Sequence, residues 1–147
     1  MAYSGKFRPK NTKKYRGDPT KIFYRSLWER QAFRWLDDQE DVVKWSSEEI
    51  VIPYRDKSSG RVRRYFPDVW LQTRNGQVYL VEIKPKKQTQ PPKQPKRQTK
   101  RYLTEVMTYA KNTSKWDAAK DYCENRGWIF QVWTEDTLKK LGIRILT

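Results

Sequence analysis

The sequence predicts one α/β domain, because a helical segment is followed by three strands, a second helical region and a further strand. Helical segments repeat their apolar residues every three or four positions, whereas strand segments are rich in β-branched and aromatic residues. A chain of 147 residues is most simply one domain with a core of its own. We expect a mixed sheet flanked by helices over residues 26–147, preceded by a basic arm at 1–25.

The arm at 1–25 shows neither a helical nor a strand period, and aromatic residues lie between its basic ones. It is either a solvated arm or an arm that contacts DNA phosphates and stacks its rings on exposed bases. In the second case the DNA-binding residues are Lys6, Arg8, Lys10, Lys13, Lys14 and Arg16.

A helix is predicted from Ser26 to about Asp38, with a broad apolar stripe on one side. Ser26 and Glu29 have the spacing of a capping box, in which the Glu29 side chain would accept a hydrogen bond at the helix start. The alternative is that the Glu29 carboxylate faces the site described next. Spacing by itself favours the cap.

The central feature is a hairpin formed by Arg64–Leu71 and Val78–Lys84, joined by a link that contains Asn75-Gly76. Side chains alternate along a strand, so Glu82 and Lys84 share one face, roughly 6–7 Å apart. The neighbouring strand can bring Asp68 beside them. Two carboxylates and a lysine in one place suit a hard cation and an activated water, whereas a surface ion pair would contribute little to stability.

Two strand-like segments precede this hairpin. Val42–Trp45 is predicted as a short strand or connector, and Glu48–Tyr54 as the first clear strand, which ends at Pro53 and a turn-rich stretch. Arg61–Tyr65 then leads into the hairpin. We expect these segments to form an antiparallel meander of three strands.

Residues 85–98 are rich in Pro, Lys and Gln and have no apolar period, so they are predicted to be an extended segment. The segment is either a solvated linker or a loop that contacts phosphates beside the hairpin. Its basic residues are Lys86, Lys87, Lys93, Lys96 and Arg97.

The C-terminal part is predicted to alternate helices and strands. The segments are a helix at Thr99–Lys111, a second helix from Ser114 to about Arg126, a strand buried on both faces at Trp128–Trp133, a short helix from Thr134 to Leu141, and an edge strand at Ile143–Leu146. The one cysteine, Cys123, lies on an apolar helix side and is expected in the core.

Charge and composition limit the function. The net charge is +15, which favours a nucleic-acid partner over an anionic membrane, since no long apolar run is present. The sequence has no histidine, which excludes histidine-based acid–base chemistry and His–metal centres. A metal site would therefore use oxygen ligands, and these favour Mg²⁺ or Mn²⁺. With a single cysteine there is no internal disulfide, and nothing indicates secretion.

The order of elements, together with Phe66-Pro67-Asp68 followed after a 13-residue gap by Glu82-Ile83-Lys84, resembles the PD-(D/E)xK, or restriction-endonuclease-like, superfamily with its α-β-β-β-α-β core. The whole chain resembles the head-completion nucleases of T-even-type tailed phages. The runs that carry this resemblance are Tyr3–Lys6, Lys14–Pro19, Tyr24–Glu29, Arg63–Phe66 and Glu82–Pro92. The last of them also resembles the endonuclease subunit of a heteromeric transposase.

The resemblance implies a Mg²⁺-dependent DNA endonuclease, with Mn²⁺ able to substitute. Asp68, Glu82 and the carbonyl of Ile83 would bind the metal, and Lys84 would orient the attacking water. It also makes Glu29 a candidate catalytic carboxylate and metal ligand. Glu105 and Tyr109 match accessory Gln and Tyr positions of some relatives, with Glu in place of Gln.

In the setting that the resemblance implies, the partners are double-stranded DNA and phage head, portal or neck proteins, in the virion head and in the host cytoplasm during assembly. Double-strand cutting would require a homodimer or two successive nicks. Two other functions stay open, a non-catalytic protein of the head that holds or plugs the DNA end and a basic RNA-binding module.

Overall fold

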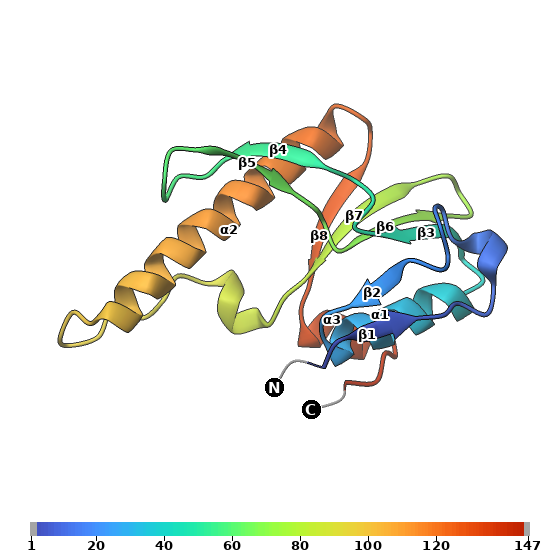
Figure 1. Cartoon of the computed structure of the whole chain (residues 1–147), viewed down its shortest axis with the longest axis horizontal. Coiled ribbons are helices and arrows are strands. Elements are labelled where there is room, and N and C mark those ends of the chain that lie inside the picture. Colours follow the sequence, from blue (N-terminus) through green and yellow to red (C-terminus); the bar gives the residue numbers. More distant parts are fainter. Residues whose placement is uncertain (1–2, 146–147) are drawn as a thin grey trace.

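The computed structural model describes residues 3–145 and centres on a four-stranded sheet with the order β3–β6–β7–β8 (Figure 1). β3, β6 and β7 pair antiparallel, and β8 lies parallel to β7, which makes the sheet mixed, as predicted. The strands are β3 at Val42–Ser47, β6 at Val69–Thr73, β7 at Val78–Ile83 and β8 at Ile129–Trp133. The predicted hairpin is the β6–β7 pair, but its predicted first strand, Arg64–Leu71, is divided, since Tyr65 ends another strand and β6 begins only at Val69.

Helices cover both faces of this sheet. On one face, α1 (Leu27–Asp38) and α3 (Glu135–Lys140) pack against sheet residues such as Leu71 and Val81. On the other face, α2 (Lys100–Glu124) and a separate two-stranded ribbon pack against Trp70 and Leu80. The ribbon consists of β4 (Ile52–Arg55) and β5 (Val62–Tyr65). Side chains alternate along β6 and β7, so each strand contributes to both layers.

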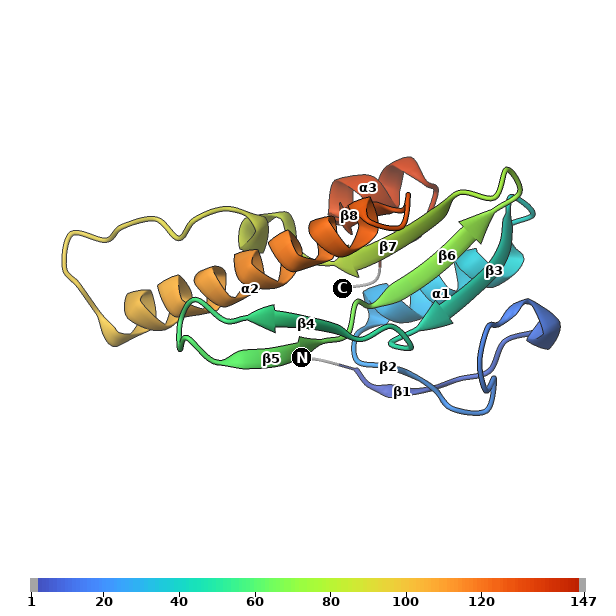
Figure 2. The same ribbon diagram turned by 90° about the horizontal axis from the view of Figure 1, so that it is seen from above.

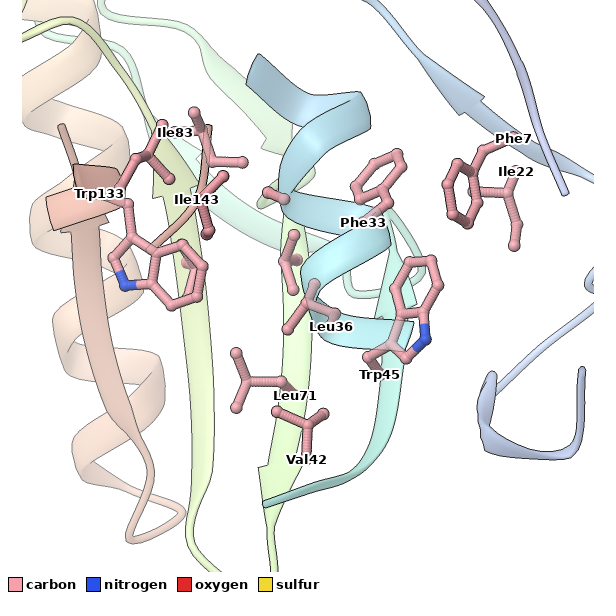
Figure 3. Close-up of a cluster of buried hydrophobic side chains, with 14 of the residues drawn as sticks. Phe7, Ile22, Phe33, Leu36, Val42, Trp45, Leu71, Ile83, Trp133 and Ile143 are labelled. Atoms are coloured by element: carbon pink, nitrogen blue, oxygen red, sulfur yellow. The ribbon is translucent and has the colours of Figure 1, made fainter. Parts of the chain in front are cut away.

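The N-terminal segment is part of the domain, and the predicted arm at 1–25 is wrong in this respect. β1 (Gly5–Phe7) and β2 (Ile22–Tyr24) form a hairpin, with a 3₁₀ turn, η1 (Thr12–Lys14), between them. Phe7 and Ile22 are buried beside Phe33 and Trp45 (Figure 3). Tyr15 is buried in the same cluster, with its ring against Trp45. Strands of three residues are too short to show a period. Because the aromatic residues lie between basic ones in sequence, the pattern indicated an exposed arm, although the rings of Phe7 and Tyr15 are buried.

The meander begins one segment earlier than predicted. β3 is its first strand, and the predicted strand at Glu48–Tyr54 is reduced to the short β4 of the ribbon. Glu48 has a φ of 54°, the one positive value among the non-glycine residues of the described chain. This left-handed residue follows β3 directly and turns the chain out of the sheet.

The two helices predicted at Thr99–Lys111 and Ser114–Arg126 are one continuous helix, α2. The hydroxyls of Thr113 and Ser114 donate hydrogen bonds to the carbonyl of Ala110, at 3.0 and 2.7 Å, so Ser114 does not act as a cap. The first half of α2 extends beyond the sheet with the segment before it (Figure 2), and its predicted apolar face leaves Leu103 and Met107 about half exposed.

The C-terminal end is close to prediction. Thr134 forms a capping box at the start of α3, and Cys123 is buried in the core. β8 is an edge strand whose Ile129 is exposed, so its predicted burial on both faces is wrong. Residues 143–145 form no strand, and the last residue of the strand predicted there, Leu146, lies outside the described residues. No helix within 3–145 is both long and apolar enough to cross a membrane.

Candidate metal-dependent nuclease site

The hairpin brings Asp68, Glu82 and Lys84 together. The β6–β7 register pairs Val69 with Val81, and one further step along it sets Asp68 opposite Glu82. The Asp68 carboxylate accepts a hydrogen bond from the amide of Ile83 at 2.7 Å, which holds the Asp to the end of β7. The amide of Lys84 donates to the carbonyl of Trp133 in β8 at 3.0 Å, so both ends of the motif are fixed by the sheet.

Glu82 has a partner for each carboxylate oxygen. The hydroxyl of Tyr65 donates to Oε2 at 2.8 Å, and Nζ of Lys84 lies 3.6 Å from Oε1. Glu82 is only 7% exposed, so these groups replace water around its charge. Tyr65 stands at the end of β5, and sequence analysis did not identify it, although its inward alternation with Arg64 and Phe66 is the available signal.

These residues line a hollow of about 330 Å³. Glu29 from the first turn of α1 and Glu48 at the end of β3 also line it, together with Arg25 and Lys115. Arg25 forms an ion pair with Glu48 at 3.0 Å. The hollow therefore contains four carboxylates within a strongly basic protein.

The structure supports both interpretations of Glu29. The Ser26 hydroxyl accepts from the amide of Glu29 at 3.2 Å, as an N-cap does. The Glu29 carboxylate accepts from the amide of Arg25, one residue before the cap, at 3.2 Å. The same side chain lines the hollow, so one residue caps the helix and contributes charge to the site.

Burial and mutual repulsion act on these acids. Burial is the main cause that raises the pKa of Asp68 well above its ordinary value, and the nearby charges of Glu82 and Glu29 add to it. Burial also raises the pKa of Glu29 and of Glu48. The charged forms of Asp68, Glu29 and Glu48 are thus less stable here than in water, an imbalance that a bound cation would reverse.

The donor set fits an oxygen-liganded divalent cation. Asp68 and Glu82 supply the carboxylates, and the chain has no histidine that could compete for another type of metal. Within residues 3–145, however, no three His, Cys, Asp or Glu side chains are close enough to hold a metal by themselves. Glu29 therefore does not complete a three-carboxylate cluster in this arrangement, and the ligand set would be two carboxylates with backbone or water oxygen.

The accessory residues predicted on the helix are not at the site. Glu105 is exposed and pairs with Arg101 at 3.1 Å, and Tyr109 does not line the hollow. Lys115, farther along the continuous α2, occupies the helix side of the site instead, and its Nζ lies 5.6 Å from the ring centre of Tyr65. Burial lowers the pKa of Lys115. No local pattern marks this residue, because only the packing of α2 brings it to the hairpin.

The predicted DNA-binding residues have different surroundings. Lys14 donates to the carbonyls of Asp37 and Gln39, at 3.0 and 2.6 Å, and the guanidinium of Arg16 lies 4.4 Å from the centre of the Trp70 ring. Lys86 begins a 3₁₀ turn, η2 (Lys86–Thr89), and pairs with Asp136 of α3 at 3.4 Å. Of the predicted set, only Lys14 is partly buried. The exposed members are Lys6, Arg8, Lys10, Lys13, Arg16, Lys86, Lys87, Lys93, Lys96 and Arg97.

Comparison with known proteins gives two matches. The family described as "TnsA-like endonuclease N terminal" matches residues 39–135, a region that contains Asp68, Glu82 and Lys84 but begins after α1 and Glu29. The chain is 50% identical, over 148 aligned positions, to the head completion nuclease of Enterobacteria phage T4. This alignment covers 98% of the chain and 99% of that protein. Both matches agree with the predicted resemblances and with the restriction-endonuclease-like fold. The chain therefore belongs to the head completion nuclease family, with a TnsA-like endonuclease core.

Proposed function

We propose that this protein is a metal-dependent DNA endonuclease that hydrolyses phosphodiester bonds during phage head completion. Nuclease function in head completion agrees with its family. The observation that supports the proposed site is the convergence of Asp68, Glu82 and Lys84 in one hollow at the end of the β6–β7 hairpin.

Asp68 and Glu82 would hold Mg²⁺, or Mn²⁺ in its place, with the Ile83 carbonyl as a further oxygen donor. When bound, the cation would supply Lewis-acid polarisation of the scissile phosphate and of the attacking water. The amide of Ile83 and the hydroxyl of Tyr65 fix the two carboxylates, so little rearrangement is needed before binding.

Two lysines approach the acids from different elements. Lys84 directly follows β7, and its ammonium lies 3.6 Å from Glu82, where it can orient the attacking water. Lys115 comes from α2 and adds positive charge where the phosphoryl group becomes more negative in the transition state. Glu29 also lines the hollow, where its carboxylate can accept a hydrogen bond from a water.

The family supports a setting in phage head completion. The substrate would be double-stranded DNA, at the ends of packaged genomes, and the partners would be proteins of the phage head, portal or neck. The protein would act in the host cytoplasm during assembly and stay with the virion head. Each chain has this one proposed site, so cutting both strands would take a homodimer or two successive nicks.

The proposed function is tested by incubating supercoiled and linear DNA with the purified protein in Mg²⁺, in Mn²⁺ and in chelator, next to an Asp68→Ala/Lys84→Ala variant. We expect metal-dependent cleavage that the variant loses while it retains DNA binding. A matched control is Asp117→Ala/Lys120→Ala, which removes one acid and one base from the exposed side of α2.

Cleavage that survives in the Asp68→Ala/Lys84→Ala variant would refute the site. Binding without cleavage in either metal, with the isolated protein and with filled heads, would favour a structural protein that holds the DNA end.

A further inference from the structure

A second hollow, of about 460 Å³, lies between the β1–β2 hairpin and α1. Its lining includes five cations, and two of these, Arg30 and Arg34, come from α1 and were not among the residues that the sequence indicated as DNA-binding. The others come from β1 and the residues after it. The five are Lys6, Arg8, Lys10, Arg30 and Arg34.

Among the described residues, these cations have no acidic partner in an ion pair. None of them forms an ion pair within the part of the chain that the structure describes, residues 3–145. Two carboxylates, Asp37 and Asp38, also line the hollow. Asp37 is buried, and its carboxylate accepts a hydrogen bond from the backbone amide of Lys10 at 2.9 Å. This hydrogen bond links the segment after β1 to α1.

The wall of the hollow is a built structure. Tyr24 of β2 lies across Gly5 of β1, where a Cβ would come within 2.5 Å of its hydroxyl, so Gly5 allows the ring to occupy this position. The guanidinium of Arg30 lies 5.9 Å from the centre of the same ring. The floor includes the buried ring of Phe7. The hairpin and α1 therefore hold several positive charges around one concave surface.

Residues that are adjacent in the chain line the two hollows. Tyr24 lines the second hollow and Arg25 lines the first, while Glu29 lines the first and Arg30 the second. Arg30 and Arg34 are one helical turn apart, about 6 Å along α1. Each DNA strand carries one phosphate per about 3.4 Å of duplex axis, so this turn spans about two nucleotides.

We propose that the second hollow binds backbone phosphates of the DNA near the scissile bond. The proposal rests on the proposed function for its choice of DNA as the polyanion. Unpaired cations that converge in a hollow favour a ligand with several regularly spaced negative charges. The contacts would set position and affinity and carry no sequence information.

The test measures the affinity of a fluorescent DNA duplex by anisotropy in chelator over a series of salt concentrations. The variant is Lys6→Gln/Arg34→Gln, which removes one exposed cation from each side of the hollow. The slope of log K against log salt is negative, and each lost phosphate contact reduces its magnitude by about 0.9. We therefore expect the slope of the variant to be less steep by about 2.

Two controls make the result specific. Arg61→Gln/Lys120→Gln removes the same charge from exposed positions outside both hollows and should change the slope by less than half as much. Lys6→Arg/Arg34→Lys keeps the charges and should restore the slope. An unchanged slope in Lys6→Gln/Arg34→Gln, or an equal change in the Arg61/Lys120 control, would overturn the proposal. So would a variant that loses affinity for inorganic polyphosphate but not for DNA.

Because binding is measured in chelator, the result does not depend on cleavage. A wild-type protein that binds but never cuts would contradict the proposed function, and the salt-dependence slopes of the variants would still decide this proposal. A wild-type protein that cuts, with a variant of unchanged slope, would contradict this proposal alone.

Discussion

Replacing Tyr65 by Phe removes one hydroxyl from the site and leaves the ring in place. That hydroxyl donates to Glu82 at 2.8 Å, and both residues are buried. Burial and the adjacent Glu82 raise the pKa of Tyr65, so the hydroxyl remains a donor throughout the neutral range. The substitution leaves the Oε2 atom of a buried carboxylate without this donor.

A hydrogen bond to a charged group contributes about 1.5–3 kcal/mol. If the bond serves to hold Glu82 in position for the transition state, Tyr65→Phe lowers the cleavage rate by about 10–100-fold. The matched control is Tyr54→Phe. Tyr54 is also buried and lies 6.4 Å from Tyr65 between ring centres, but its hydroxyl has no hydrogen-bond partner among residues 3–145.

The assay is the rate of plasmid nicking at saturating Mg²⁺, combined with urea unfolding followed by tryptophan fluorescence. The loss in Tyr65→Phe should shrink to near zero in a Glu82→Gln background, because the two residues act as one unit. Equal losses in Tyr65→Phe and Tyr54→Phe would refute the argument. So would a full loss in the Glu82→Gln background.

Three further predictions concern the other groups in the hollow. Lys115→Gln should lower cleavage about tenfold or more through lost transition-state charge, and exposed Lys120→Gln is the control that should have no effect. Burial lowers the pKa of Lys115 from its ordinary 10.5, so in the alkaline range the folded state binds fewer protons than the unfolded state. The stability of the wild type should therefore rise with alkaline pH, whereas that of Lys115→Gln should not. Glu29→Gln can still accept from the amide of Arg25, so unfolding in urea should change little while cleavage falls, whereas unchanged cleavage would make Glu29 a helix cap only. Mg²⁺ at about 100 times its Kd should stabilise the wild type by about 2.7 kcal/mol, measured as a rise in Tm, and an equal rise in Asp68→Asn/Glu82→Gln would place the cation elsewhere.

The hairpin could be predicted because its signals are local. Alternation puts Glu82 and Lys84 on one face, the Asn75-Gly76 turn sets the register, and the register brings Asp68 opposite Glu82. The structure places these residues as the sequence indicated. The roles assigned to them remain predictions.

Lys115 and the N-terminal hairpin could not be predicted, because distant packing determines both. Lys115 reaches the site only because α2 continues through Thr113 and Ser114, whose hydroxyls bond within the helix. Polar residues of this kind more often cap a helix, so the sequence favoured a break. The strands of the N-terminal hairpin have three residues each, and Phe7 and Ile22 are covered by α1 and β3, elements that follow later in the chain.

The charge distribution is the strongest argument for catalysis over a purely structural role. A protein with a net charge of +15 would hold DNA more tightly and fold more stably without acids in its central hollow. This chain nevertheless keeps Asp68, Glu29 and Glu48 there, each with a pKa raised mainly by burial. Glu48 also has a φ of 54°, a conformation that costs about 1–3 kcal/mol in a non-glycine residue. Partly buried acids and backbone strain at one place are useful if a cation and a phosphate must meet there, whereas a protein that only plugs a DNA end does not need them.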